Sequence, residues 1–144
     1  MTPDVNVLLA ASRCDHPYHA VAYNWLEQAV AAASHGSPMR LQPMVVASFL
    51  RLATHPKIFV QPTPVEAALR FIDTLLAAPG VDRPLLGAEW PILKKLCVDR
   101  SFAANDIPDA WLAAIVIQQG EHLVSFDAVY KRFLARNQFT HLKP

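Results

Sequence analysis

The chain begins MTPDVNVLLAA (residues 1–11), a stretch in which one carboxylate, that of Asp4, enters apolar and partly β-branched sequence. This composition predicts a first strand from about Pro3 to Ala10, with Asp4 at its mouth. An ionised carboxylate is costly to bury unless it meets a cation, a metal or strong hydrogen-bond donors. Two interpretations follow: Asp4 is a metal ligand if other carboxylates converge on it, and a cap if none does.

Length and composition indicate a globular chain with one core. A chain of 144 residues is large enough to bury such a core, and we expect a single domain over residues 1–144. Charged residues make up 17% of the chain, against roughly 25% in an average soluble domain. This shortfall indicates apolar surface that a second copy or another chain covers. The formal net charge of +1 excludes a global basic field, so a polyanion would need a local patch or a metal ion.

The lack of a recognisable targeting signal and the pattern of cysteines favour a cytoplasmic location. No apolar segment approaches the roughly 20 residues that span a bilayer, and the N-terminus lacks a basic segment followed by a cleavage site. We therefore expect a cytoplasmic protein that does not bind membranes. Cys14 and Cys97 lack metal-ligand spacing, which favours free, buried thiols over a disulfide.

Hydrophobic periodicity and breaker residues predict alternating strands and helices. After the first strand, further strands are expected over residues 39–41, 81–86, 123–126 and 141–142. Helices are expected over residues 19–33, 43–54, 64–76, 91–102, 110–119 and 130–135. This order is typical of a three-layer α/β/α fold, in which helices cover both faces of a mostly parallel central sheet.

Two more aspartates lie where ligands gather in such a fold, at the carboxyl ends of strands and the starts of helices. Asp109 lies in the first turn of the most apolar helix, and Asp127 follows the strand 123–126. Carboxylates that converge repel one another unless a hard cation such as Mg²⁺ or Mn²⁺ joins them. Each also has a simpler role. In that role the Asp109 carboxylate interacts favourably with the dipole of its helix, Asp127 caps the helix that follows it, and Asp106 caps the helix that contains Asp109.

Five motifs in chain order resemble the PIN-domain family, specifically the VapC-type ribonuclease toxins of bacterial toxin–antitoxin pairs, in the branch best known from mycobacteria. The motifs are the D-x-N-V-L start at residues 4–8, the run 15–27, the pair of segments 48–51 and 54–59, the acidic motif at 105–114 and the closing S-x-D motif at 125–133. Together they cover nearly the whole chain.

This resemblance implies a PIN-like domain that acts as the toxin of a type II toxin–antitoxin system, a Mg²⁺-dependent endoribonuclease with Mn²⁺ as an alternative metal. It assigns metal binding and catalysis to Asp4, Asp109 and Asp127, with Asn6 orienting Asp4. Relatives in this family cut structured RNA such as tRNA or rRNA. The resemblance also implies a homodimer and a VapB-type antitoxin whose helix covers an apolar groove.

Two positions depart from the family pattern. Ser48 stands where many PIN domains have a glutamate, and Val129 stands where others have a further aspartate. The lower negative charge predicts one Mg²⁺ in the free protein, with a second arriving only with RNA phosphate. It also leaves open the alternative of a non-catalytic RNA- or protein-binding module with a degraded metal site. Arg51 either neutralises the acidic pocket, meets phosphate, or forms a salt bridge over the sheet.

The remaining aromatic and histidine residues favour structural roles. His16, His19 and His55 lack the spacing of a zinc site, so capping or loop packing is the preferred interpretation. Trp25, Trp90 and Trp111 lie on predicted helices, where core or interface packing is preferred over base stacking.

Overall fold

The computed structural model describes residues 1–143. Its strands are β1 (Thr2–Pro3), β2 (Met39–Arg40), β3 (Val81–Asp82), β4 (Leu123–Ser125) and β5 (Phe139–His141). Its α-helices are α1 (Val5–Ser12), α2 (His19–Ala33), α3 (Pro43–Ala53), α4 (Val65–Leu76), α5 (Trp90–Arg100) and α6 (Asp106–Gln119). Two short 3₁₀ helices, η1 (Ala128–Arg132) and η2 (Arg136–Gln138), lie between β4 and β5.

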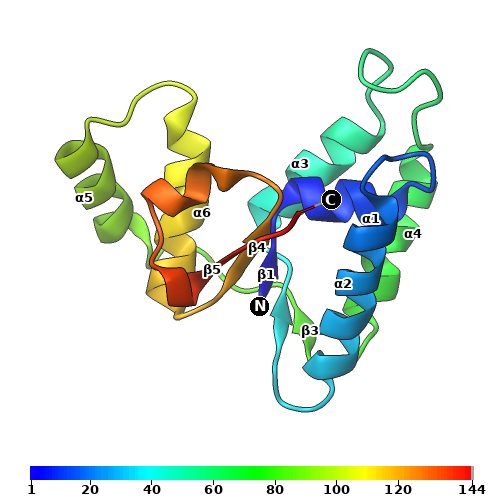
Figure 1. Cartoon of the computed structure of the whole chain (residues 1–144), viewed down its shortest axis with the longest axis horizontal. Helices are drawn as coiled ribbons and strands as arrows, with labels where there is room; N and C mark the ends of the chain where they lie inside the picture. Colours follow the sequence, from blue (N-terminus) through cyan, green and yellow to red (C-terminus); the bar gives the residue numbers. More distant parts are fainter. Residues whose placement is uncertain (144) are drawn as a thin grey trace.

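The strands form a three-stranded sheet, β1-β4-β5, and a two-stranded sheet, β2-β3, and all of their pairs are parallel. The N–H of Arg40 donates to the carbonyl of Met1 at 2.8 Å, which places β2 beside β1 and continues the sheet in the spatial order β3-β2-β1-β4-β5. Figure 1 shows this sheet between α5 and α6 on one side and α1, α2 and α4 on the other. The predicted α/β fold with a parallel sheet is therefore confirmed.

The predicted first strand over Pro3 to Ala10 is wrong beyond Pro3, because the chain turns into α1 at Val5. Asp4 keeps an extended backbone, and its carboxylate accepts a hydrogen bond from the Val5 N–H at 2.7 Å. It is thus the N-cap of α1, a role that aspartate fills well. A short, continuous apolar run fits a buried helix as well as a buried strand, and periodicity alone does not separate them.

Smaller differences occur elsewhere. The predicted helix over 130–135 is the 3₁₀ helix η1, and the predicted strand over 81–86 is limited to β3. Asp106 is the first residue of α6 rather than its cap, which is Asn105. The last strand, β5, begins at Phe139, two residues before the predicted start. The thiols are free, but Cys14 is exposed and Cys97 half-buried, so the prediction that both are buried is wrong.

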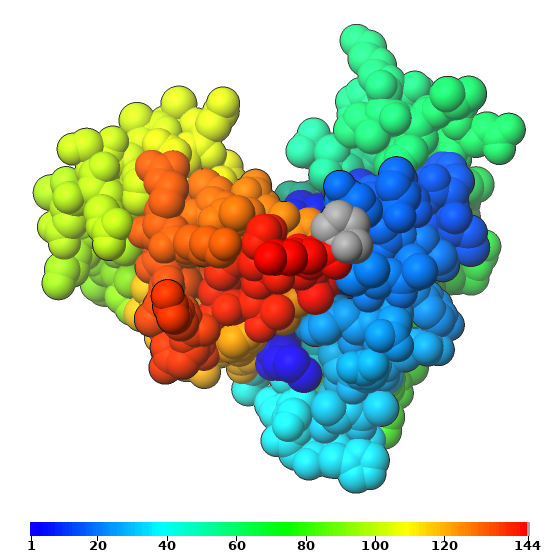
Figure 2. Space-filling model, viewed as in Figure 1, coloured from blue at the N-terminus to red at the C-terminus, as the bar shows by residue number. Residues whose placement is uncertain are grey.

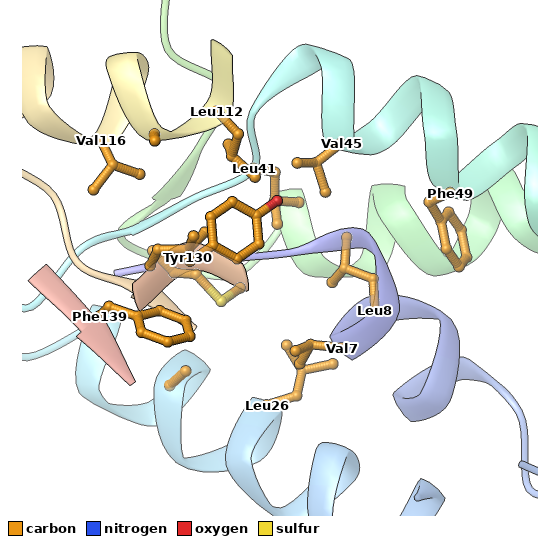
Figure 3. Close-up of a cluster of buried hydrophobic side chains, with 14 of the residues drawn as sticks. Val7, Leu8, Leu26, Leu41, Val45, Phe49, Leu112, Val116, Tyr130 and Phe139 are labelled. Atoms are coloured by element: carbon orange, nitrogen blue, oxygen red, sulfur yellow. The ribbon is translucent and has the colours of Figure 1, made fainter. Parts of the chain in front are cut away.

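The core lies where α1, α2, α3 and α6 meet the sheet. Figure 3 shows Val7 and Leu8 of α1 among side chains from α2, α3 and α6. Every residue from Leu112 to Val116 is buried, because α6 packs against α5 on one side and against η1 and the core on the other. Among residues 1–143, no helix has the length and apolar character needed to cross a membrane.

Gly80 lies in the turn before β3, where the backbone packs closely against the end of α2. Its φ is +78°, and a Cβ there would lie 2.1 Å from the Ala33 carbonyl oxygen. Gly36 has a similar φ of +93° but open space around it. Gly36→Ala should therefore cost about 1–2 kcal/mol from backbone strain alone. Gly80→Ala should cost about 1–3 kcal/mol more, because the Ala33 backbone must move.

Urea denaturation of both variants measures this difference in the free energy of unfolding. Equal losses for Gly36→Ala and Gly80→Ala would show that the contact with Ala33 does not constrain the turn.

Candidate active site

Asp4 lies at the carboxyl end of β1, between the sheet and α1. Its N–H donates to the Val124 carbonyl of β4 at 2.9 Å, which continues the pairing of the two strands. The residue is only 5% exposed. While Oδ1 caps α1, Oδ2 accepts hydrogen bonds from the Ser125 hydroxyl at 2.7 Å and the Asn6 amide at 3.1 Å. Donors therefore hold both oxygens of Asp4 in one orientation.

Asn6 and Ser125 support Asp4 and also each other. The Asn6 amide nitrogen donates to Ser125 Oγ at 2.9 Å, and its oxygen accepts from the Phe126 N–H at 3.2 Å. Ser125 Oγ also accepts from the Asp127 N–H at 2.9 Å. The predicted contact of Asn6 with Asp4 is thus present, and the same network positions the chain that follows β4.

Asp109 belongs to α6, a different element from those that hold Asp4. It lies half-buried in the first turn of α6 and accepts a hydrogen bond from the Tyr130 hydroxyl at 3.2 Å. Tyr130 comes from η1, is only 3% exposed, and lies among the core side chains in Figure 3. This buried ring carries the hydroxyl that orients the Asp109 carboxylate.

Asp4 and Asp109 line one small pocket. It has a volume of about 90 Å³, enough for an ion and a few waters. Its lining comprises Asp4, Val5, Met44, Val45, Ser48, Pro108, Asp109, Leu112 and Tyr130. Figure 2 shows the surface hollowed between the lobe of α5 and α6 and the lobe of α3. The carboxylate pocket, as we call it, thus draws its walls from α3 on one side and α6 on the other.

Not every predicted site residue reaches this pocket. Ser48 lines it, whereas Asp127 is exposed, does not line it, and caps η1 through a bond of 2.8 Å from the Val129 N–H. Arg51 is exposed on α3, away from the pocket lining, and forms no ion pair within residues 1–143. The structure thus brings Asp4 and Asp109 together and leaves Asp127 outside the lining, close enough for its charge to act on both.

The electrostatics of the pocket reflect its buried negative charge. Burial, together with the charges of Asp109 and Asp127, raises the pKa of Asp4 to about 6, against hydrogen bonds from Ser125 and Val5 that lower it. Burial and Asp127 also raise the pKa of Asp109, against the Tyr130 hydrogen bond. Burial, with the charges of Asp4 and Asp109, raises the pKa of Tyr130 far above its ordinary value, so it remains a hydrogen-bond donor.

The donor set fits a hydrated hard cation. Among residues 1–143, no group of three or more His, Cys, Asp or Glu side chains is placed to hold a metal ion. Two carboxylates with raised pKa values nevertheless face one pocket, and a divalent cation there would offset the charge that they share. Mg²⁺ commonly binds through one or two carboxylates and keeps several waters.

The supporting residues Ser125 and Tyr130 were missed as site residues from the sequence. Each belongs to the closing motif, but nothing in the spacing indicates that their hydroxyls turn toward Asp4 and Asp109. The histidines behave as predicted: the ring nitrogens of His16 and His55 accept from the N–H groups of Tyr18 and Lys57. Trp90 and Trp111 are both exposed.

Comparisons with known proteins agree with this architecture. The PIN domain family matches residues 1–134. Ribonuclease VapC31 and ribonuclease VapC25 of Mycobacterium tuberculosis are each 37% identical over 142 residues, which is 98% of this chain and 96% of the relative. Ribonuclease VapC43 of the same species is 36% identical over 90% of this chain and 87% of its own.

A solved structure shares the fold. It is that of VapBC2 from Rickettsia felis bound to a DNA fragment from their promoter. The TM-score is 0.63 at 17% sequence identity, over 96% of this chain and 94% of the other.

The raised pKa of Asp4 predicts a characteristic dependence of stability on pH. The folded state retains the Asp4 proton up to about pH 6, whereas the unfolded state releases it near the ordinary value of 3.8. The unfolded state therefore binds fewer protons in this window, and stability falls as pH rises from about 4 to 6. Asp4→Asn removes this loss. The free energy of unfolding of the variant should therefore rise, relative to that of the wild type, by up to about 3 kcal/mol between pH 4 and pH 7.

Denaturant unfolding across this pH range measures the difference. Glu89→Gln is the control of opposite sign. Burial raises the pKa of Glu89, but hydrogen bonds from the Trp111 indole and the Gly87 N–H leave it below the ordinary value. Replacing the Glu89 carboxylate should therefore lower the free energy of unfolding by more as pH rises. A difference between Asp4→Asn and the wild type that does not change with pH would refute the burial argument.

Proposed function

The chain belongs to the PIN-domain family, and we propose that it is a metal-dependent endoribonuclease, the toxin of a type II toxin–antitoxin pair. One observation carries this proposal. Asp4 and Asp109 face the same small pocket, and burial and like charge raise the pKa of both. The relatives at 37% identity are named ribonucleases, which supports the same activity here.

In this proposal Asp4 and Asp109 hold the metal, Mg²⁺ or Mn²⁺, with Asp127 as the third acid outside the lining. When bound, such a metal activates water and stabilises charge on a phosphoryl oxygen. Asn6 and Ser125 hold Asp4 in one rotamer, and Tyr130 does the same for Asp109. These donors prearrange the carboxylates, so little reorganisation is needed when substrate arrives.

The proposed substrate is structured RNA such as tRNA or rRNA. The hollow between the lobes of α3 and α6 suits a protruding loop, since sequence-specific RNA recognition targets unstacked, single-stranded segments. We propose that residues 1–144 act as one domain in the cytoplasm.

The proposed partners are a second copy of the chain and a VapB-type antitoxin. An apolar groove of about 490 Å³ between α2 and α4 supports a helical partner, and Tyr23, Leu26, Val30, Phe71 and Leu75 belong to its lining.

The alternative is a non-catalytic module that binds RNA or protein. One observation favours it: within residues 1–143, only Asp4 and Asp109 contribute carboxylates to the pocket lining, because Ser48 stands on the wall formed by α3 and Val129 lies outside the lining. The two functions differ in a single measurement, namely whether RNA is cut in the presence of Mg²⁺.

The purified chain should cut total RNA in Mg²⁺ or Mn²⁺, and Asp4→Asn and Asp109→Asn should each lower the cleavage rate by at least about 10²-fold, because each removes a metal-binding charge. Gel electrophoresis of the products measures the rate. Asp73→Asn, which removes an exposed carboxylate from α4, is the matched control and should cleave at the wild-type rate. RNA left equally intact by the wild type and by both pocket variants would favour the non-catalytic module.

Ser48→Glu should strengthen metal binding, because it adds a third carboxylate to a pocket that already holds two. We expect the Kd for Mn²⁺, measured by isothermal titration calorimetry, to fall about tenfold or more. Ser48→Gln has a side chain of the same length without the charge and should leave the Kd within about twofold. Equal affinities for Ser48→Glu and Ser48→Gln would mean that metal does not bind between α3 and α6.

A further inference from the structure

Positive charge is concentrated in the last segment of the chain. Residues 128–143 contain Lys131, Arg132, Arg136 and Lys143 and no Asp or Glu. The 13 Lys and Arg residues of the chain thus leave nine in residues 1–127, against all 12 Asp and Glu residues, a formal charge of −3. The overall charge of +1 is therefore the sum of an acidic body and a short basic segment.

Part of this segment encloses a second pocket, which we call the basic pocket. It has a volume of about 490 Å³ and is formed by η1, η2 and β5. Its lining residues are Lys131, Leu134, Ala135, Arg136, Phe139 and His141. It combines two cations with an apolar floor, a pairing that suits the phosphate and the sugar or base of a nucleotide.

Lys131 and Arg136 are available to a ligand. Both are exposed, and neither forms an ion pair in the part of the chain that the structure describes. Arg132, between them, differs. It pairs with Asp106 at 3.4 Å and lies over the ring of Phe102 at 5.3 Å. Arg132 therefore ties η1 to α6, whereas neither flanking cation is engaged in such a pair within residues 1–143.

His141 adds a polar group without a partner. Its Nε2 lies 3.1 Å from the Phe126 carbonyl oxygen, which accepts a hydrogen bond and so places the proton on Nε2. Its Nδ1 is buried and has no hydrogen-bond partner within residues 1–143. An unpaired buried polar atom is costly, so this ring is held by its Nε2 contact with Phe126 and by packing rather than by a second hydrogen bond within residues 1–143.

The basic pocket and the carboxylate pocket adjoin across η1. Tyr130 lines the carboxylate pocket, and the next residue, Lys131, lines the basic pocket. On the far side, the contact of His141 with Phe126 brings β5 beside the residue that precedes Asp127. Lys131 thus lies one residue from the wall of the carboxylate pocket, whereas Arg136, which precedes β5, lies toward the amino end of that strand.

We propose that the basic pocket binds a backbone phosphate of the RNA strand that flanks the bond to be cut. This inference rests on the proposed ribonuclease function. The acidic body repels RNA, so affinity must come from a local group of cations, and Lys131 and Arg136 line one pocket that begins a residue away from the carboxylate pocket. An acidic polypeptide would also meet these cations, but the position of Lys131 next to a residue of the carboxylate pocket favours RNA.

The test compares two double variants of the whole chain. Lys131→Ala with Arg136→Ala removes the cations of the basic pocket. Arg70→Ala with Lys95→Ala removes the same charge from exposed positions on α4 and α5. Cleavage of a single-stranded RNA oligonucleotide gives KM and kcat, and fluorescence anisotropy in EDTA at increasing KCl gives the dependence of binding on salt.

The basic-pocket variant should raise KM about tenfold and leave kcat unchanged, because it removes binding that is equal in the ground and transition states. Its slope of log affinity against log salt should fall by about 0.7, the value for the one phosphate that the protein no longer neutralises. The Arg70 and Lys95 variant should keep the wild-type KM and slope.

Equal changes in the two double variants, or a wild-type KM in the basic-pocket variant, would overturn the proposal while leaving the ribonuclease function intact. If the wild type cuts no RNA, weaker RNA binding by the basic-pocket variant still supports the pocket, and only the catalytic proposal fails. Wild-type RNA affinity combined with weaker binding of poly-glutamate would assign the pocket to an acidic protein instead.

Discussion

The hydrogen bond of 2.7 Å from Ser125 to Asp4 joins the ends of two neighbouring strands that are 121 residues apart in the sequence, and the rest of the site depends on it. The same Ser125 oxygen accepts from the Asn6 amide and from the Asp127 N–H. One hydroxyl thus sets the rotamer of Asp4, the start of α1 and the turn into η1. Since η1 carries Tyr130, it also determines where Asp109 finds its donor.

This arrangement works against stability at neutral pH. A buried carboxylate whose pKa is raised to about 6 is charged at a cost, and Asp109 and Asp127 add to that cost. The fold tolerates it because apolar helices surround the site: α1 buries Val7 and Leu8, and α6 is buried from Leu112 to Val116. A sequence selected for stability alone would not retain such charges, so they favour a functional explanation.

The sequence predicted elements well where periodicity and breakers agreed. The bounds of α2 were predicted as observed, because apolar residues recur at helical spacing and the segment 34–38 ends the helix. The start of the chain was harder. Its continuous apolar run gave no period, and only the structure shows that the strand stops at Pro3 and that the chain turns into α1 at Val5. The sequence also set the two roles of Asp4 against each other as alternatives. The structure shows that one oxygen caps α1 while the other remains within the donor network.

Residues that act through long-range contacts could not be predicted. The hydroxyls of Ser125 and Tyr130 meet carboxylates 121 and 21 residues away, and no local pattern encodes such partners. Net charge was equally uninformative, because +1 averages an acidic body and a basic segment. Charge matters where the fold places it. The turn of η1 puts Tyr130 into the carboxylate pocket and Lys131 into the basic pocket, so adjacent residues serve surfaces of opposite sign. In the proposed ribonuclease this contrast has a use, because cations near the carboxylates would attract an RNA strand that the carboxylates themselves repel.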